Sequence, residues 1–279
     1  MLTAAPKPAG RGNEATPTTV AEEARALGLV PAEVETVRSG SGLERLEAAA
    51  PEVLAVVAYG EILPPHVLGL AAVAPVNLHF SLLPALRGAS PVQAALLLGW
   101  DRTGVTTIAM DAGLDTGPIL LQREEPIAPE DDAGTLGDRL AAVGADLLVE
   151  TVDLLASGPP APRPQDEALA TLAPKLRPSD RILFWSEPAR ALVNRCRALS
   201  PAPAATTSFR GTALKVFRAE ATEGAGEPGR IVAVSRDGII VATGDGGFRP
   251  VALAPAGRRR MSGGDFVNGF RPEVGERLG

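Results

Sequence analysis

A proline-rich segment, Pro159–Pro164, divides this chain of 279 residues into two parts with different hydrophobic patterns. Before it, short apolar runs typical of strands alternate with amphipathic stretches typical of helices. The expected strands are Val53–Ala58, Val76–Phe80, Val105–Met110 and Ile119–Arg123, and the expected helices begin near Thr19 and Ser41 and then span Pro91–Leu98 and Thr135–Ser157. This alternation predicts an α/β fold, in which the apolar run Val53–Ala58 suits a parallel strand buried on both faces by helices.

After the proline-rich segment, the pattern changes to short strands separated by glycines. One helix is expected over Pro188–Leu199, followed by strands over Leu214–Arg218, Arg230–Ser235, Ile239–Thr243 and Val251–Leu253, with Asp245-Gly246 as a hairpin turn. Short strands at this spacing predict a small β-barrel. We therefore expect an α/β domain over residues 1–158, a linker over 159–177 and a barrel domain over 178–279.

Composition narrows the class of protein without identifying it. With 45% hydrophobic and 22% charged residues, the chain is long enough for two packed domains of ordinary globular type. No apolar run reaches the ~18 residues of a membrane span, and the first residues do not resemble a signal peptide. A single cysteine, Cys196, excludes an internal disulfide, and two histidines leave few metal ligands. A cytoplasmic protein without a metal or a membrane partner is therefore expected.

The charge is unevenly divided between the two parts. From residue 178 onward the chain carries 15 Arg or Lys and 10 Asp or Glu, a net charge of +5, whereas the preceding residues have a net charge of −11. A basic part within an acidic protein suits a polyanionic partner such as RNA, through contacts to phosphates. An incidental surface bias explains the same numbers equally well.

The residues most suggestive of chemistry are Asn77 and His79 in one expected strand, with Asp115 in a glycine-flanked loop. Side chains two apart on a strand leave the same face, so the amide and the imidazole converge. An amide can stabilise a developing oxyanion, an imidazole can carry a proton, and a carboxylate can orient that imidazole. This set suits acyl transfer to an external nucleophile, because no serine or cysteine stands in a recognisable nucleophile motif. On spacing alone, an ordinary strand-end histidine is the commoner explanation.

Longer motifs favour the catalytic interpretation. VNLHFSLLPALRG (Val76–Gly88), GLDTG (Gly113–Gly117) and AYGEILP (Ala58–Pro64) resemble the folate-dependent formyltransferases, and among them those that act on methionyl-tRNA. The similarity extends from PAGRG (Pro8–Gly12) to LAPAGRRRMSGGDFVNG (Leu253–Gly269), nearly the whole chain. The resemblance implies a Rossmann-like parallel-sheet formyltransferase domain followed by an OB-like barrel that helps to bind tRNA.

The resemblance also implies an activity. Enzymes of this kind transfer the formyl group of 10-formyltetrahydrofolate to the amino group of methionine on initiator tRNA, for translation initiation. Asn77 would donate to the oxyanion of the tetrahedral intermediate, and His79 beside it would donate or accept a proton. Asp115 would hold and polarise His79, or relay the proton.

Other motif positions carry over as binding or shaping residues. The family's folate-contacting loop corresponds to Ser81, Leu82, Leu83 and Pro84, and Arg11 in the PAGRG segment would contact the tRNA. Arg87-Gly88 would form loop structure with a charge contact, and Tyr59-Gly60 and Leu63-Pro64 would shape the site from a neighbouring strand end. A monomer without metal is expected.

The start of the chain departs from the family. A strand–helix–strand unit of roughly 30 or more residues precedes PAGRG there, whereas only Met1–Lys7 precede it here. The expectation is a natural start upstream of Met1; otherwise the sheet lacks its first strand and the formyl-donor site lacks one wall. Two alternatives stay open: a sugar-nucleotide N-formyltransferase, which shares the Asn-His-Asp set, and an inactive tRNA-binding remnant. PAGRG, the long C-terminal motif and the basic C-terminal part favour tRNA over a sugar.

Overall fold

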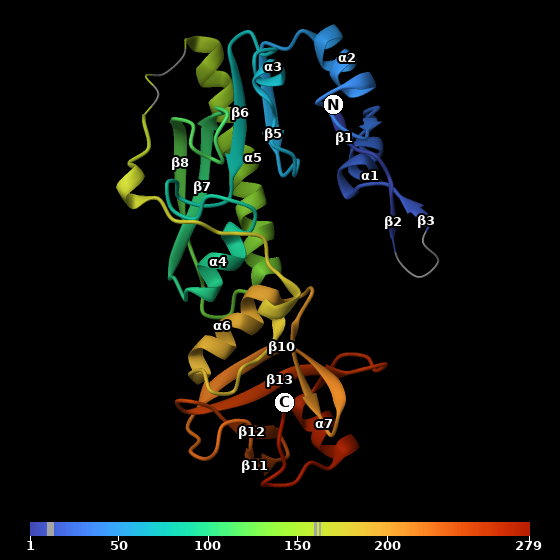
Figure 1. Ribbon diagram of the computed structural model, residues 1–279, viewed down its shortest axis with the longest axis vertical. Helices are drawn as coiled ribbons and strands as arrows, with labels where there is room; N and C mark the ends of the chain where they lie inside the picture. Colours follow the sequence, from blue (N-terminus) through green and yellow to red (C-terminus); the bar gives the residue numbers. More distant parts are fainter. Residues whose placement is uncertain (10–13, 159–160, 162) are drawn as a thin grey trace.

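The computed structural model describes residues 1–9, 14–158, 161 and 163–279, which form an α/β part and a β part (Figure 1). The N-terminal strands lie towards one end of the long axis and the C-terminal antiparallel sheet lies at the other. The predicted fold class, an α/β domain with parallel strands followed by a small β domain, is confirmed. In the proline-rich segment, Pro159, Pro160 and Pro162 lie outside the described residues.

A four-stranded sheet forms the centre of the α/β part. Its strands, in spatial order, are β5 (Val53–Val57), β6 (Ala74–His79), β7 (Arg102–Ala109) and β8 (Ile119–Pro126). β5 and β6 are parallel, whereas β7 and β8 are each antiparallel to the preceding strand. Helix α5 (Ala133–Ser157) runs along this sheet. It approaches β6 closely because Gly144 has no side chain; a Cβ there would lie 2.8 Å from Leu78 Cδ2.

One expectation about this sheet is wrong. The apolar run beginning at Val53 does form a strand parallel to β6, but it is not buried on both faces, since Ala55 is exposed and Val57 is 43% exposed. The reason is topological: among the described residues β5 is the outer strand of the four-stranded sheet and pairs only with β6. The apolar run therefore predicted the strand correctly, but it did not predict how much of the strand is buried.

The N-terminal strands form two further small sheets. β1 (Leu2–Ala4) and β4 (Ala32–Val34) pair in parallel, and β2 (Lys7–Ala9) and β3 (Glu14–Thr16) form an antiparallel pair. The helices of this region are α1 (Thr19–Ala26), α2 (Gly40–Ala49) and α3 (Pro65–Leu68). A groove of 580 Å³ is lined by residues of β1, β4, α2 and β5, including Leu2, Ala32 and Leu54. Across it, in the part of the chain that is described, no strand pairing joins β1 or β4 to β5.

The C-terminal part is an antiparallel sheet around one core. Its elements are α6 (Ala189–Leu199), β9 (Ala205–Phe209), β10 (Thr212–Thr222), β11 (Ile231–Ser235), β12 (Gly238–Ala242), β13 (Gly247–Pro255), β14 (Met261–Ser262) and α7 (Gly263–Phe270). The sheet order is β11-β12-β13-β10-β9, with β14 beside β13. Arg277 and Leu278 bridge to Arg230, just before β11, and to Phe209 in β9. This strip joins the two outer strands, as the predicted barrel requires, whereas β9, β14 and α7 were not predicted.

The described part of the linker runs back along the α/β part. It contains one 3₁₀ turn, η1 (Glu167–Leu169), and a second, η2 (Pro178–Arg181), follows directly after the linker. Arg163 exchanges backbone hydrogen bonds with Ile119 at 2.8 and 3.1 Å, and Ala173 N–H donates to the Arg87 carbonyl at 2.7 Å. The linker therefore pairs with β8 and with the loop after β6, while the boundaries at residues 158 and 178 stay a prediction.

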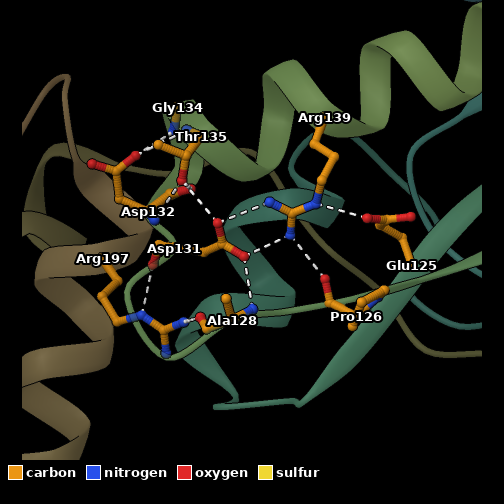
Figure 2. A network of polar contacts seen from close by, with 9 residues as sticks. All are labelled: Glu125, Pro126, Ala128, Asp131, Asp132, Gly134, Thr135, Arg139 and Arg197. Atoms are coloured by element: carbon orange, nitrogen blue, oxygen red, sulfur yellow. Dashed lines mark hydrogen bonds and ion pairs between the residues drawn. The ribbon is translucent and has the colours of Figure 1, made fainter.

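The two parts meet where α4 (Pro91–Leu97) packs on α6, and where Arg197 of α6 reaches the loop before α5 (Figure 2). Arg197 Nε donates to the carbonyl of Asp131, and Nη2 donates to that of Ala128, both at 2.7 Å. The Asp131 carboxylate binds Arg139 Nη2 at 2.6 Å, and this hydrogen bond holds the pKa of Asp131 below its usual range. Charged hydrogen bonds therefore add to the apolar packing at the junction.

Candidate active site

A cavity of 380 Å³ opens at the carboxyl end of β6. The three residues predicted to do the chemistry, Asn77, His79 and Asp115, all line it. Tyr59 and Leu63 also line it, from the segment after β5 that was expected to shape the site. The structure thus brings together residues that are separated by more than thirty positions in the chain.

Strand β6 places its alternate side chains in different surroundings. Val76 and Leu78 are buried in the core, and Asn77 and His79 reach the cavity, which Leu78 also lines. His79 is 6% exposed, and its Nε2 lies 2.9 Å from the carbonyl oxygen of Leu86. Because a carbonyl only accepts hydrogen bonds, Nε2 carries a proton and Nδ1 is the nitrogen that can gain or lose one.

Asp115 reaches His79 from the loop between β7 and β8. Its backbone has a φ of +54°, in the left-handed region, and the loop is tied by the Asp111 Oδ1 atom, which accepts from the Gly113 N–H at 3.0 Å. Asp115 Oδ2 accepts from the Gly88 N–H at 2.8 Å and lies 3.6 Å from His79 Nδ1. The loop therefore points the carboxylate at the imidazole nitrogen that is free to exchange a proton.

The Asn77 amide completes the arrangement. Within the described ranges its side chain has no hydrogen-bond partner, although it lines the cavity next to His79. Its N–H groups can donate to an oxygen atom bound there. A hydrogen-bond donor, a proton carrier and a carboxylate thus surround one space, which suits attack of an external nucleophile on a carbonyl carbon.

Family models match both parts of the chain. The model for formyl transferases matches residues 1–152, and that for the formyl transferase C-terminal domain matches residues 175–271. The chain belongs to the formyl transferase family. It is therefore a member of a family of formyl-transferring enzymes, and the predicted resemblance is confirmed.

Relatives in this family carry a more specific name. A methionyl-tRNA formyltransferase of Acidithiobacillus ferrooxidans is 42% identical over 281 residues, covering 100% of this chain and 90% of that protein. The solved methionyl-tRNA formyltransferase of Clostridium thermocellum has a TM-score of 0.55 and 19% identity, covering 74% of this chain and 87% of that one. An N-formyltransferase of Helicobacter canadensis, in complex with folinic acid and dTDP-3-aminofucose, has a TM-score of 0.62 and 15% identity, covering 91% and 85%. The sugar alternative is not favoured, because the latter likeness extends only to the fold.

Ser81–Pro84, predicted to contact folate, directly follow Phe80, which lines the cavity, but none of these four residues is part of the described lining. Ser81 is 0% exposed and donates its hydroxyl to the Ala85 carbonyl at 2.6 Å. Leu83 is 3% exposed, and its N–H donates to Thr106 Oγ1 at 3.1 Å. Leu82 and Pro84 are half-buried. A folate-binding role for this loop stays a prediction, as does the tRNA contact of Arg11, which lies outside the described residues.

A network of polar contacts holds the Asp115 loop, and the sequence predicted only part of it. Arg87, whose expected charge contact is present, is 5% exposed and donates to Glu167 at 2.7 and 2.9 Å and to Gln165 Oε1 at 2.8 and 3.1 Å. The hydrogen bond with Glu167 raises the pKa of Arg87, and the same bond lowers the pKa of Glu167. Gln165 Nε2 donates to the Asp115 carbonyl at 2.7 Å. Gln165 belongs to no recognised motif, so the sequence carried no signal for it.

Three further observations concern other kinds of chemistry. Within the described residues, no group of three or more His, Cys, Asp and Glu side chains could hold a metal ion. The same residues include no helix with the length and apolarity needed to cross a membrane. Cys196 in α6 is completely buried, and this burial raises the pKa of its thiol, contrary to what a nucleophilic cysteine requires.

Proposed function

We propose that this protein transfers the formyl group of 10-formyltetrahydrofolate to the α-amino group of methionine on initiator tRNA. The observation that carries the proposal is 42% identity over the whole chain to a methionyl-tRNA formyltransferase. The convergence of Asn77, His79 and Asp115 on one cavity supports it. The folinic acid in the related Helicobacter structure supports a folate donor.

The reaction begins when the amine nitrogen attacks the formyl carbon and the carbonyl electron pair moves to oxygen. The Asn77 amide donates a hydrogen bond to that oxyanion. His79 Nδ1 accepts the proton that the amine loses, because Nε2 is engaged by the Leu86 carbonyl. Collapse then breaks the bond from the formyl carbon to the folate nitrogen N10, which takes the proton from His79. The products are formylmethionyl-tRNA and tetrahydrofolate.

Asp115 acts on the charge of His79 during this transfer. Its carboxylate side chain is 16% exposed and lies 3.6 Å from Nδ1, so it stabilises the imidazolium that forms when the amine proton arrives. At an effective dielectric constant of about 20, a charge pair near this distance attracts by about 4 kcal/mol before desolvation is counted. The same contact orients the ring, because it acts on the nitrogen opposite the one held by Leu86.

Substrate binding is assigned to one loop of the α/β part and to basic residues elsewhere in the chain. In the folate loop, the half-buried Leu82 and Pro84 contact the donor, while the buried Ser81 and Leu83 hold the loop in shape. Arg11 and the exposed basic run Arg258–Arg260 contact the tRNA, in keeping with the basic C-terminal part. The protein acts as a monomer in the cytoplasm.

The decisive experiment is formyl transfer from 10-formyltetrahydrofolate to initiator methionyl-tRNA by the full chain. We expect turnover, and we expect His79→Ala to lower kcat by about 10²–10⁴-fold, the usual contribution of a positioned proton carrier. His66→Ala is the matched control, because His66 lies outside the cavity lining and bonds only the Arg38 carbonyl among the described residues.

The other outcomes distinguish the alternatives. Salt-sensitive tRNA binding without formyl transfer would indicate an inactive tRNA-binding protein. Formylation of a sugar nucleotide such as a dTDP-aminosugar, with methionyl-tRNA left unmodified, would overturn the choice of acceptor.

A further inference from the structure

The linker contributes a side chain to the loop that carries Asp115. Gln165 Nε2 donates to two carbonyl oxygens of that loop, those of Asp115 and Gly117, each at 2.7 Å. These contacts span 50 and 48 positions in the chain. The amide thus clamps the backbone on both sides of Thr116.

The Gln165 amide is held in one orientation. Arg87 Nε and Nη2 donate to its Oε1 at 3.1 and 2.8 Å, and a guanidinium can only donate, so the oxygen must face Arg87 and the nitrogen must face the loop. Arg87 is fixed in turn by two hydrogen bonds to the Glu167 carboxylate. The orientation of the clamp is therefore fixed by hydrogen bonds within the protein.

The Asp115 backbone needs such a clamp. Asp115 has its φ of +54° in the left-handed region, which aspartate adopts more readily than most residues with a side chain but which remains uncommon. The carboxylate has one firm hydrogen bond, from the Gly88 N–H, and its distance to His79 is 3.6 Å. A small rotation of this backbone would move the carboxylate away from His79 Nδ1.

We propose that Gln165 is a positioning residue for formyl transfer, which acts by holding Asp115 against His79. The inference rests on the proposed function of the cavity, since it assigns Gln165 a part in that reaction. Gln165 touches neither substrate nor reacting atoms; its effect passes through the Asp115 backbone. The linker is consequently part of the catalytic apparatus as well as a connection between domains.

Two substitutions separate this role from simple stabilisation. Gln165→Ala removes both sets of hydrogen bonds, whereas Gln165→Glu keeps an acceptor for Arg87 but loses the donors to Asp115 and Gly117. In the glutamate variant a carboxylate oxygen faces the Asp115 and Gly117 carbonyls, so the loop is released while Arg87 keeps an acceptor at this position. The matched control is Asp166→Ala, because among the described residues the Asp166 side chain accepts only from the Ala168 N–H of its own turn.

We expect both Gln165 variants to lower kcat by about 10–100-fold, as displacement of a catalytic group does, with little change in KM for the folate. In an Asp115→Ala background, Gln165→Ala should change kcat by less than about twofold, because coupled residues are not additive. Hydrogen exchange at residues 113–117 should be faster in both Gln165 variants and unchanged in Asp166→Ala.

The result that overturns the proposal is wild-type kcat in Gln165→Glu, or a kcat that follows thermal stability across the three variants. If the wild-type chain transfers no formyl group, the proposed function fails separately, and hydrogen exchange still decides whether Gln165 holds the loop. Unchanged exchange in Gln165→Ala would then exclude the clamp itself.

Discussion

Two polar networks in this molecule centre on an aspartate, and they differ in how completely that aspartate is bonded. Around Asp131 (Figure 2), both carboxylate oxygens are fully engaged. Oδ1 accepts from Thr135 Oγ1 and Arg139 Nη1, each at 3.0 Å, and Oδ2 accepts from the Ala128 N–H at 2.7 Å and Arg139 Nη2 at 2.6 Å. The side chain is 5% exposed. This network is saturated within the protein.

Around Asp115 the hydrogen bonds are incomplete on the side that faces the cavity. The backbone and one carboxylate oxygen are bonded, but the contact to His79 is 3.6 Å, longer than a hydrogen bond. Asn77 follows the same pattern, since its amide has no partner among the described residues. The difference teaches that a saturated network serves stability, whereas one that ends at a cavity retains bonding capacity for a substrate.

The largest expected difference concerns Asn77. Asn77→Ala should lower kcat for formyl transfer by about 10²–10³-fold, because it removes one oxyanion donor. The free energy of unfolding should hardly change, since no protein hydrogen bond is lost in the described part of the chain. Steady-state kinetics and urea unfolding of the same preparation check both statements. An Asn77→Ala variant that is destabilised but still fully active would contradict this distinction between the two networks.

Asp131→Asn should show the opposite behaviour. It should lower the free energy of unfolding by about 1.5–3 kcal/mol, the range for hydrogen bonds to charged groups, because the new amide presents donors where Arg139 and the Ala128 N–H also donate. The lower end is expected because Arg139 is 35% exposed. We expect kcat per folded molecule to stay the same. Asp153→Asn, at an exposed position on α5, is the control, and an equal loss there would contradict the assignment.

The smallest effect is the pH dependence of this stabilisation. The hydrogen bond from Arg139 lowers the pKa of Asp131 below the ordinary value of 3.8. A depressed carboxylate pKa gives stability that is complete above the unfolded value and is lost as pH falls through the folded value. The stability difference between wild type and Asp131→Asn should therefore be constant above about pH 5 and shrink below pH 3.8. Urea unfolding at several pH values tests this, and a difference that grows on acidification would refute it.

Local patterns were sufficient for much of the fold. The periodicity expected from Thr135 to Ser157 became α5 within two residues, and period-two alternation correctly put Asn77 and His79 on one face of β6. The helices expected near Thr19 and Ser41 begin at Thr19 and Gly40, and the residue that caps α1 is Thr18, which accepts from the Ala21 N–H. Adjacent threonines offer the same chemistry, so only the backbone geometry selects between them.

Long-range features of the site could not be predicted in this way. Asp115 was found only because a glycine-flanked family motif marks its loop, and Gln165 was missed because it reaches that loop through the return path of the linker. The exposure of β5 was missed for a related reason: an apolar strand has the same composition at the edge of a sheet as at its centre. In each case the missing information is the position of a segment distant in the chain.

Arg197 has a consequence for how this protein loses its structure. Its guanidinium donates to two backbone carbonyls on the other side of the domain junction, and its burial there lowers its pKa. Separating the domains would break both of these hydrogen bonds. The barrel and the α/β domain should therefore unfold together, in a single calorimetric transition, although separate family models match the two parts. Cooperativity in this chain is then a property of the junction as much as of either core.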